Sequence, residues 1–204
     1  MSKIEKYIQY YDDGKKSREG TYNSHNREEG KWTYWFWNGQ KMWEGTYKNG
    51  IKVGIWISWS MTGEKWMEET FKDGKNVGLR TSWYKNGQKS MEELHKDGKL
   101  NGKWTSWYRN GKKRVDSTYK DGKQDGPNIN FYENGQKNKE GTYKDGKRDG
   151  KWTTWYVNGQ KNKEGTYKDG KQDGLWTYYK EDGSIDKVEY YKDGKKLKRR
   201  WNDR

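Results

Sequence analysis

Residues 140–174 read EGTYKDGKRDGKWTTWYVNGQKNKEGTYKDGKQDG, in which nearly the same segment occurs twice at an offset of 24 residues. The same offset extends along most of the 204-residue chain. It relates seven glycines, which are Gly30, Gly54, Gly78, Gly102, Gly126, Gly150 and Gly174. A fixed period of this length is typical of repeat proteins, whose units share one local structure and contact mainly their neighbours.

Each repeat contains two glycine turns between runs that favour strands. In the quoted segment these are Asn158-Gly159 and Asp169-Gly170. Such dipeptides favour two-residue type I′ hairpin turns, because both central residues need a positive φ. No period of 3.6 residues indicates a helix. We therefore predict an all-β fold, an elongated single-layer antiparallel meander of about seven 24-residue β-hairpin repeats.

The repeats define the expected domain organisation. We predict a single repeat domain over residues 1–204, with repeats starting near residues 30, 54, 78, 102, 126, 150 and 174. A partial N-terminal cap covers about residues 1–29, and a basic C-terminal tail covers residues 195–204. Residues 23–29 are expected to form a longer loop, and Pro127, the only proline, is expected at the start of a strand.

The two turns together predict a register. The turn at residues 158–159 pairs Trp152 with Gly165, and the turn at residues 169–170 pairs Glu164 with Leu175. Side chains alternate between the two faces of a strand. We call the face with Trp152, Gly165 and Tyr167 the first face, where the glycine is expected to leave room for the ring of Trp152. The other, second face carries Glu164, and Lys151 is expected opposite Glu140.

A column of rings recurs on the second face, one ring per repeat. We call it the second-face ring column, and it comprises Trp35, Trp59, Trp83, Trp107, Phe131, Trp155 and Tyr179. The column has two interpretations. The rings stack on their neighbours and stiffen the sheet, or they form the contact surface for a partner.

Composition limits the classes of function. Only 27% of the residues are hydrophobic, but 17% are aromatic, and the net charge is +14. A positive charge favours an acidic partner, and exposed lysines also keep a sheet soluble. Cysteine is absent, and no apolar run reaches the ~20 residues needed to span a bilayer. Without an apolar secretory segment at the N-terminus, a cytoplasmic location is expected.

No pattern predicts catalysis. The glycine spacing follows from turns, and the carboxylates recur in every repeat instead of forming one special pair. His95 occupies a position that holds Tyr in other repeats and is expected to be a packing residue, while His25 lies in the irregular loop. We therefore predict no catalytic, cofactor-binding or metal-binding residues, and a protein that is not an enzyme.

The segments GKWTTWYVNGQKNKEGTYKDGKQDG from Gly150 and GKWTSWYRNGKKRVDSTYKDGKQDG from Gly102 resemble the MORN repeat variant of bacterial proteins in the YwqK family of antitoxins. The resemblance covers about residues 7–194. It implies a sheet of successive hairpins and a role in binding other molecules, with neutralisation of a toxin as one such role.

Four functional hypotheses follow. The first is a non-enzymatic protein-interaction module, antitoxin-like or immunity-like, whose partner contacts the second-face ring column. The second is binding of single-stranded nucleic acid, since lysines and rings together match phosphates and bases. The third is an architectural component of a larger assembly. The fourth is contact with an anionic membrane or a glycan, since aromatic rings also stack on sugar rings. The sequence does not identify the partner, the face it uses or the oligomeric state.

Overall fold

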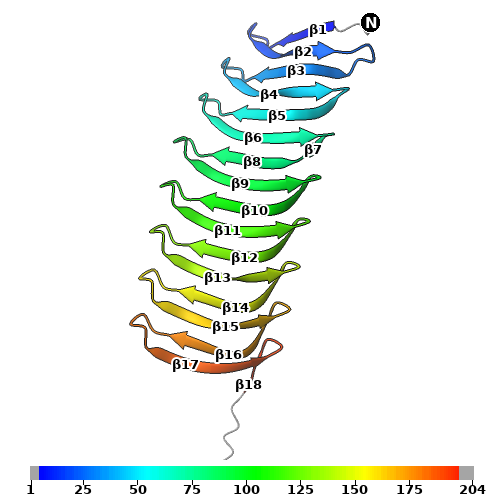
Figure 1. The fold of residues 1–204 in the computed structure, drawn as a ribbon. Helices are drawn as coiled ribbons and strands as arrows, with labels where there is room; N and C mark the ends of the chain where they lie inside the picture. The colour runs from blue at the N-terminus through cyan, green and yellow to red at the C-terminus, as the bar shows by residue number, and fades with distance from the viewer. Residues whose placement is uncertain (1–4, 198–204) are drawn as a thin grey trace, which may run out of the picture. The chain divides into compact units, whose positions relative to one another are not determined.

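The structure, a computed structural model, describes residues 5–197 and contains strands and turns, with no helix among these residues. The chain divides after Leu100 into two compact units. Within each unit, consecutive strands pair side by side in an antiparallel meander (Figure 1). The all-β meander of hairpins is confirmed. The single domain and the elongated shape remain predictions.

Unit 1 contains nine strands, in which β7 and β8 both pair with β6 and together replace one strand. They are β1 (Glu5–Tyr10), β2 (Lys16–Tyr22), β3 (Glu28–Trp35), β4 (Lys41–Lys48), β5 (Ile51–Trp59), β6 (Lys65–Lys72), β7 (Lys75–Asn76), β8 (Gly78–Trp83) and β9 (Lys89–Lys96). The predicted long loop is present, since residues 23–27 separate β2 from β3.

Unit 2 contains the other nine strands, apart from the first two residues of β10. They are β10 (Lys99–Trp107), β11 (Lys113–Lys120), β12 (Lys123–Phe131), β13 (Lys137–Lys144), β14 (Lys147–Trp155), β15 (Lys161–Lys168), β16 (Lys171–Tyr179), β17 (Ile185–Lys192) and β18 (Lys195–Leu197). Of the predicted basic tail, Lys195–Leu197 form β18, and residues 198–204 lie outside the described residues.

The Asp-Gly turns have the predicted geometry. Asp169 has a φ of 51° and Gly170 a φ of 85°, as a type I′ turn requires. Most of these turns also bond to the preceding repeat; for example, the Gly170 amide donates to the Arg148 carbonyl at 2.9 Å. These bonds align the turns of neighbouring repeats along one side of the meander.

The Asn-Gly turns differ from the prediction. Asn158 is not among the residues with positive φ, whereas Gly159 has a φ of 89°. The Tyr156 amide donates to the Gln160 carbonyl at 2.8 Å, and the Gly159 amide donates to the Tyr156 carbonyl at 3.0 Å. The connection is therefore a three-residue loop with a left-handed glycine. A shift between Thr154 and Trp155 compensates for the extra residue, so Trp152 still pairs with Gly165 as predicted.

The glycine that starts each repeat marks a bulge that the sequence analysis did not predict. All seven of these glycines have positive φ, between 67° and 119°. In unit 2 the register shifts there by two residues, so that Glu164 pairs with Thr177. The predicted pairing of Glu164 with Leu175 is therefore wrong. Because the shift is even, it leaves the assignment of residues to the two faces unchanged.

The core lies on the first face and consists of tryptophan rings on glycines. Trp32, Trp56, Trp152 and Trp176 are at most 3% exposed. A Cβ atom added at Gly165 would lie 2.3 Å from the Trp176 ring. The predicted partner ring, Trp152, instead covers Gly141, where the corresponding distance is 2.2 Å. Each indole therefore reaches back across the sheet to the glycine of the preceding repeat.

Hydrogen bonds and tyrosines fix the position of these indoles. Trp176 donates from Nε1 to the Thr166 carbonyl at 3.2 Å, and Trp152 donates to the Thr142 carbonyl at 3.1 Å. The Tyr167 ring lies between the two indoles, with centroid distances of 6.0 and 5.0 Å and nearly perpendicular planes. Edge-to-face pairs of this kind are favourable, so the core continues from one repeat to the next.

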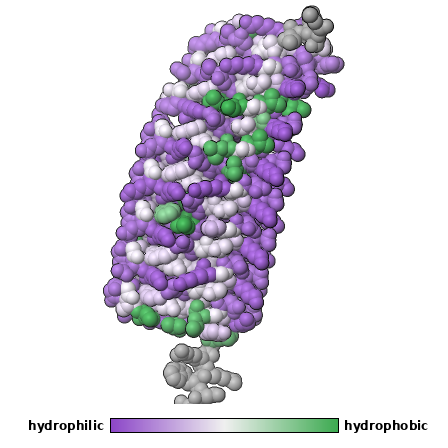
Figure 2. All heavy atoms as spheres, viewed as in Figure 1, coloured by the Kyte–Doolittle hydropathy of each residue, from purple (hydrophilic) through white to green (hydrophobic). Residues whose placement is uncertain are grey.

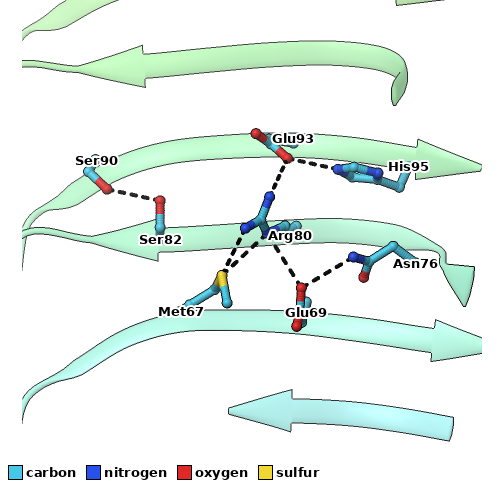
Figure 3. A network of polar contacts seen from close by, with 8 residues as sticks. All are labelled: Met67, Glu69, Asn76, Arg80, Ser82, Ser90, Glu93 and His95. Carbon is cyan, nitrogen blue, oxygen red and sulfur yellow. Dashed lines mark hydrogen bonds and ion pairs between the residues drawn. The ribbon is translucent and has the colours of Figure 1, made fainter. Parts of the chain in front are cut away.

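In unit 1 a polar network replaces one tryptophan–glycine pair (Figure 3). Arg80 stands at the tryptophan position, with Nη1 3.1 Å from Glu93 Oε2 and Nε 3.5 Å from Glu69 Oε2. Glu93 is 7% exposed and also contacts Nε2 of His95 at 2.8 Å. Burial raises the pKa of Glu93, but hydrogen bonds from His95 and Arg80 outweigh burial and lower it. His95 occupies the tyrosine position, as predicted, and pairs with Gly78.

Unit 2 contains a neutral version of the same replacement. Asn128 stands at the tryptophan position and donates to Oγ of Ser117, which replaces the glycine, at 2.9 Å. Pro127 lies inside β12 and not at a strand start, so that prediction is wrong. It is tolerated because β11 and β12 shift register between Ser117 and Tyr119, beside Pro127.

Candidate interaction surface

Each ring of the second-face ring column is the last residue of its strand. The strands that end on these rings are β3, β5, β8, β10, β12, β14 and β16. All seven rings are half-buried. The first face supplies the buried core, so the second-face rings retain exposed surface at regular intervals along each unit.

Lysines accompany the column. Lys161 pairs in register with Trp155, and its ammonium lies 5.9 Å from the centroid of the next ring, Tyr179. In the same way, Lys137 lies 5.6 Å from the Trp155 ring. These are cation–π distances. Five rings of the column have such a lysine, namely Trp35, Trp59, Trp83, Trp155 and Tyr179.

Carboxylates neutralise these lysines. Lys161 Nζ lies 3.0 Å from Glu164 Oε1, and Lys137 Nζ lies 2.7 Å from Glu140 Oε2. The same spacing recurs in Lys16–Glu19, Lys41–Glu44, Lys65–Glu68, Lys89–Glu92 and Lys113–Asp116. The second face therefore alternates rings with ion pairs, and a second lysine approaches the carboxylate in some repeats, as Lys151 does at Glu164.

Glu164 has the most strongly perturbed carboxylate of the column. The Tyr179 hydroxyl donates to it at 2.7 Å, and Lys161 and Lys151 each approach it at 3.0 Å. The Tyr179 hydrogen bond is the main cause that lowers the pKa of Glu164 to about 2. Lys151 was expected opposite Glu140, and its contact with Glu164 corrects that prediction. Lys151 contacts Glu164 because Thr153 pairs with Glu164 in register, and Lys151 lies two residues before Thr153 on the same face of β14.

An open groove of about 560 Å³ lies on the second face of unit 2. Pro127 and Ile129 form its apolar wall, and Trp155 also lines it. Its charged lining residues are Glu140, Lys151, Lys161 and Glu164. Pro127 and Ile129 stand where the next repeat has Lys151 and Thr153. These two substitutions give the groove its apolar wall, and the repeat pattern did not predict a site there.

Unit 1 presents exposed apolar residues on its second face that the sequence analysis also missed. Ile55 is 56% exposed, Leu79 is 51% exposed and Leu94 is 40% exposed. Leu79 pairs directly with Leu94. Figure 2 shows that hydrophobic residues gather in a few groups on the face in view, among mostly hydrophilic side chains.

Within residues 5–197, no three His, Cys, Asp or Glu side chains are grouped so that they could hold a metal ion. The described part of the chain also contains no helix that could cross a membrane.

The hairpins, their aligned turns and the recurring rings define a β-hairpin repeat protein. The model of the MORN repeat variant matches residues 6–24, 100–121, 124–145, 148–169 and 172–193, together just over half of the chain. The chain therefore belongs to the family of MORN repeat variants, whose repeats are generally protein-interaction or membrane-interaction modules. No curated protein matches the chain significantly.

Proposed function

We propose that this chain is a non-enzymatic protein-interaction module whose partner contacts the second-face ring column. One observation carries the proposal. The rings of this column remain half-buried although the first face already supplies a core of tryptophans that are at most 3% exposed. Aromatic side chains with one exposed side are enriched at the centres of protein interfaces.

The partner surface extends over the apolar residues of unit 1. Leu79 and Leu94 pair across β8 and β9, and Trp83 ends β8 on the same face. Ion pairs such as Lys89–Glu92 border these residues. An apolar centre with a polar rim is the usual anatomy of a protein interface. The groove of unit 2 provides a second place in which a partner side chain is accommodated.

Partner capture from the native host tests this proposal. We expect Leu79→Ser/Leu94→Ser and Trp59→Phe/Trp83→Phe each to weaken capture at least about tenfold, since central interface residues contribute most to affinity. Phe131 occupies the same column naturally, so phenylalanine should be tolerated by the fold. The matched control is Trp37→Ser/Met61→Ser, which removes two exposed apolar residues from loops.

The control variant should capture the partner as well as the wild type does. Circular dichroism verifies that all variants remain folded. Equal capture by all variants, or equal loss in the control, would contradict a role of the second face.

An antitoxin-like role is the finer form of the proposal. The resemblance to antitoxins supports it, together with a surface suited to binding. Expression of the captured partner alone should then stop growth of the host, and co-expression of this chain should restore it. A partner that is harmless alone would contradict the antitoxin role but not the binding role.

Binding of single-stranded nucleic acid is the alternative function for the same surface, and it needs a separate test. Rings and lysines alternate on the second face, but each lysine of the column also contacts a carboxylate. Phosphate binding would give an affinity that falls steeply with salt. A steep salt dependence with oligonucleotides, lost in Trp59→Phe/Trp83→Phe, would favour nucleic acid over a protein partner.

A further inference from the structure

On the first face of unit 2, one row of register partners carries lysines. Lys139 pairs with Thr154, Thr154 with Lys163, and Lys163 with Tyr178, across β13 to β16. The corresponding row of unit 1 contains large apolar side chains instead, namely Trp43, Met67 and Met91. The fold therefore accepts apolar residues in this row, and packing does not require lysines there.

The lysines border a small hollow together with an arginine. Lys139, Arg148 and Lys163 line a cavity of about 160 Å³ with Trp152, Thr154, Tyr167 and Trp176. The Arg148 guanidinium lies 4.8 Å from the centroid of Trp152 and donates from Nη1 to the Tyr167 hydroxyl at 3.0 Å. Arg148 is thereby held against the indole at the edge of the hollow.

No carboxylate lines this hollow. Within residues 5–197, neither Lys139 nor Lys163 is in an ion pair, whereas Lys137 and Lys161, on the same two strands, each pair with a glutamate. The acids on β13 and β15 outside the turns are Glu140 and Glu164, and both lie on the second face. Three half-buried cations that share a hollow without a counter-charge repel one another.

We propose that this hollow is a binding site for a tetrahedral oxyanion of the phosphate class. A bound anion would offset the repulsion among Lys139, Arg148 and Lys163. Ligand pockets for drug-sized molecules are about 300–1,000 Å³, so the hollow suits a single phosphate-sized group. Lys139 and Lys163 lie on either side of Thr154, roughly 10 Å apart from strand to strand. Donors that approach from several directions match a tetrahedral ion better than a planar carboxylate.

Calorimetric titration with inorganic phosphate at constant ionic strength tests the site. We expect saturable binding with a Kd on the order of 1 mM. In Lys139→Gln/Lys163→Gln, binding should weaken at least about tenfold. The matched control is Lys144→Gln/Lys168→Gln, which changes the same net charge on the same strands but at exposed positions beside the turns. It should bind phosphate as the wild type does.

A titration with glycerol 3-phosphate distinguishes a free ion from a phosphate that belongs to a larger molecule. Equal affinity assigns the site to phosphate alone, and higher affinity for the ester assigns it to a phosphorylated ligand. Lack of saturable binding to the wild type, or equal weakening in both double variants, would overturn the site. The Tm supplies a second readout, since phosphate should raise it in the wild type and not in Lys139→Gln/Lys163→Gln.

Discussion

At the residue scale, stability depends on small residues that lie under large rings. The indole of Trp152 occupies the space that a side chain at Gly141 would need. Its Nε1 satisfies the Thr142 carbonyl in the same contact. A single-layer sheet has no second layer to pack against, so a flat ring on the backbone is its means of burying apolar surface.

A double-mutant cycle tests this contact. Gly141→Ala should destabilise the protein by about 1–3 kcal/mol, because the new Cβ would overlap the Trp152 ring. The cost should be smaller when Trp152 is also replaced by Leu, and chemical denaturation measures both values. Gly122→Ala is the control, since Gly122 has a φ of 84° and no neighbour within 4 Å. Its cost should be the same in both backgrounds, and equal behaviour of the two alanines would contradict the steric account.

The carboxylate of Glu164 predicts a dependence on pH. Its pKa of about 2, caused mainly by the Tyr179 hydroxyl, lies below the unfolded value of about 4.3. A lowered folded pKa stabilises the protein above the unfolded pKa, and this stabilisation is lost as the pH falls through about 2. The Tm of Glu164→Gln should therefore fall less than that of the wild type between pH 5 and pH 2. In Tyr179→Phe, an NMR titration should show a higher pKa for Glu164, and an unchanged value would contradict the assigned cause.

At the element scale, hydrogen bonds join neighbouring hairpins at both kinds of turn. On the Asn-Gly side, the Tyr156 hydroxyl donates to the Tyr179 carbonyl at 2.8 Å, and Asn158 donates to the Glu181 carbonyl at 3.0 Å. Equivalent bonds from Tyr132 and Asn134 reach Trp155 and Val157. These bonds explain why Tyr and Asn recur at fixed places in the repeat, beyond what the turn itself needs.

The polar network of unit 1 predicts a large effect of one substitution. Arg80→Met would leave Glu93, which is 7% exposed, without its guanidinium partner. Loss of one member of a buried ion pair typically costs about 3–5 kcal/mol. Lys31→Met is the control, because Lys31 is exposed and its ion pair with Glu44 is expected to contribute less than about 1 kcal/mol. Urea denaturation compares the two, and similar small losses would show that Arg80 does not support the fold.

Much of this architecture could be predicted from the sequence, and the failures share a cause. The 24-residue period and the Asp-Gly turns correctly predicted the hairpins, and alternation correctly predicted the two faces. The three-residue Asn-Gly loops and the bulges at glycines such as Gly174 were missed. The register shift at the Asn-Gly loops compensates for the extra loop residue, and the shift at the glycine bulges is two residues. Neither shift changes which side chains lie on which face, so the alternation of residues along the sequence does not reveal them.

The candidate surface was only partly predictable. The second-face ring column was visible as a periodic pattern, and its contact with a partner remains a proposal. The groove beside Ile129 and the exposed pair of Leu79 and Leu94 were not predicted. Both features arise where single repeats depart from the common pattern. A prediction based on the repeat period describes what the repeats share and therefore does not identify such departures.

At the scale of the whole molecule, the two units use one plan with different first-face residues. In unit 1 the row of Trp43 and Met67 is apolar, and in unit 2 the row of Lys139 and Lys163 is cationic. Residues 25–99, which include Glu69 and Arg80, lie outside the segments matched by the family model. The common repeat therefore supplies the fold, and the departures from it distinguish the surfaces of the two units.

A repeat protein held by neighbour contacts should tolerate the loss of one complete repeat. Deletion of residues 150–173 joins Asp149 to Gly174 and places Trp176 over Gly141, where Trp152 lay before. We expect a folded all-β protein with a lower Tm, because one interface between repeats is lost. Deletion of residues 163–173 alone is the control, since it removes most of one strand and brings Trp176 into the position of Gly165. That variant should lose cooperative unfolding in calorimetry, because tryptophans would then meet where the core needs a glycine. Equal tolerance of both deletions would show that the pairing of glycine with tryptophan does not determine the order of the strands.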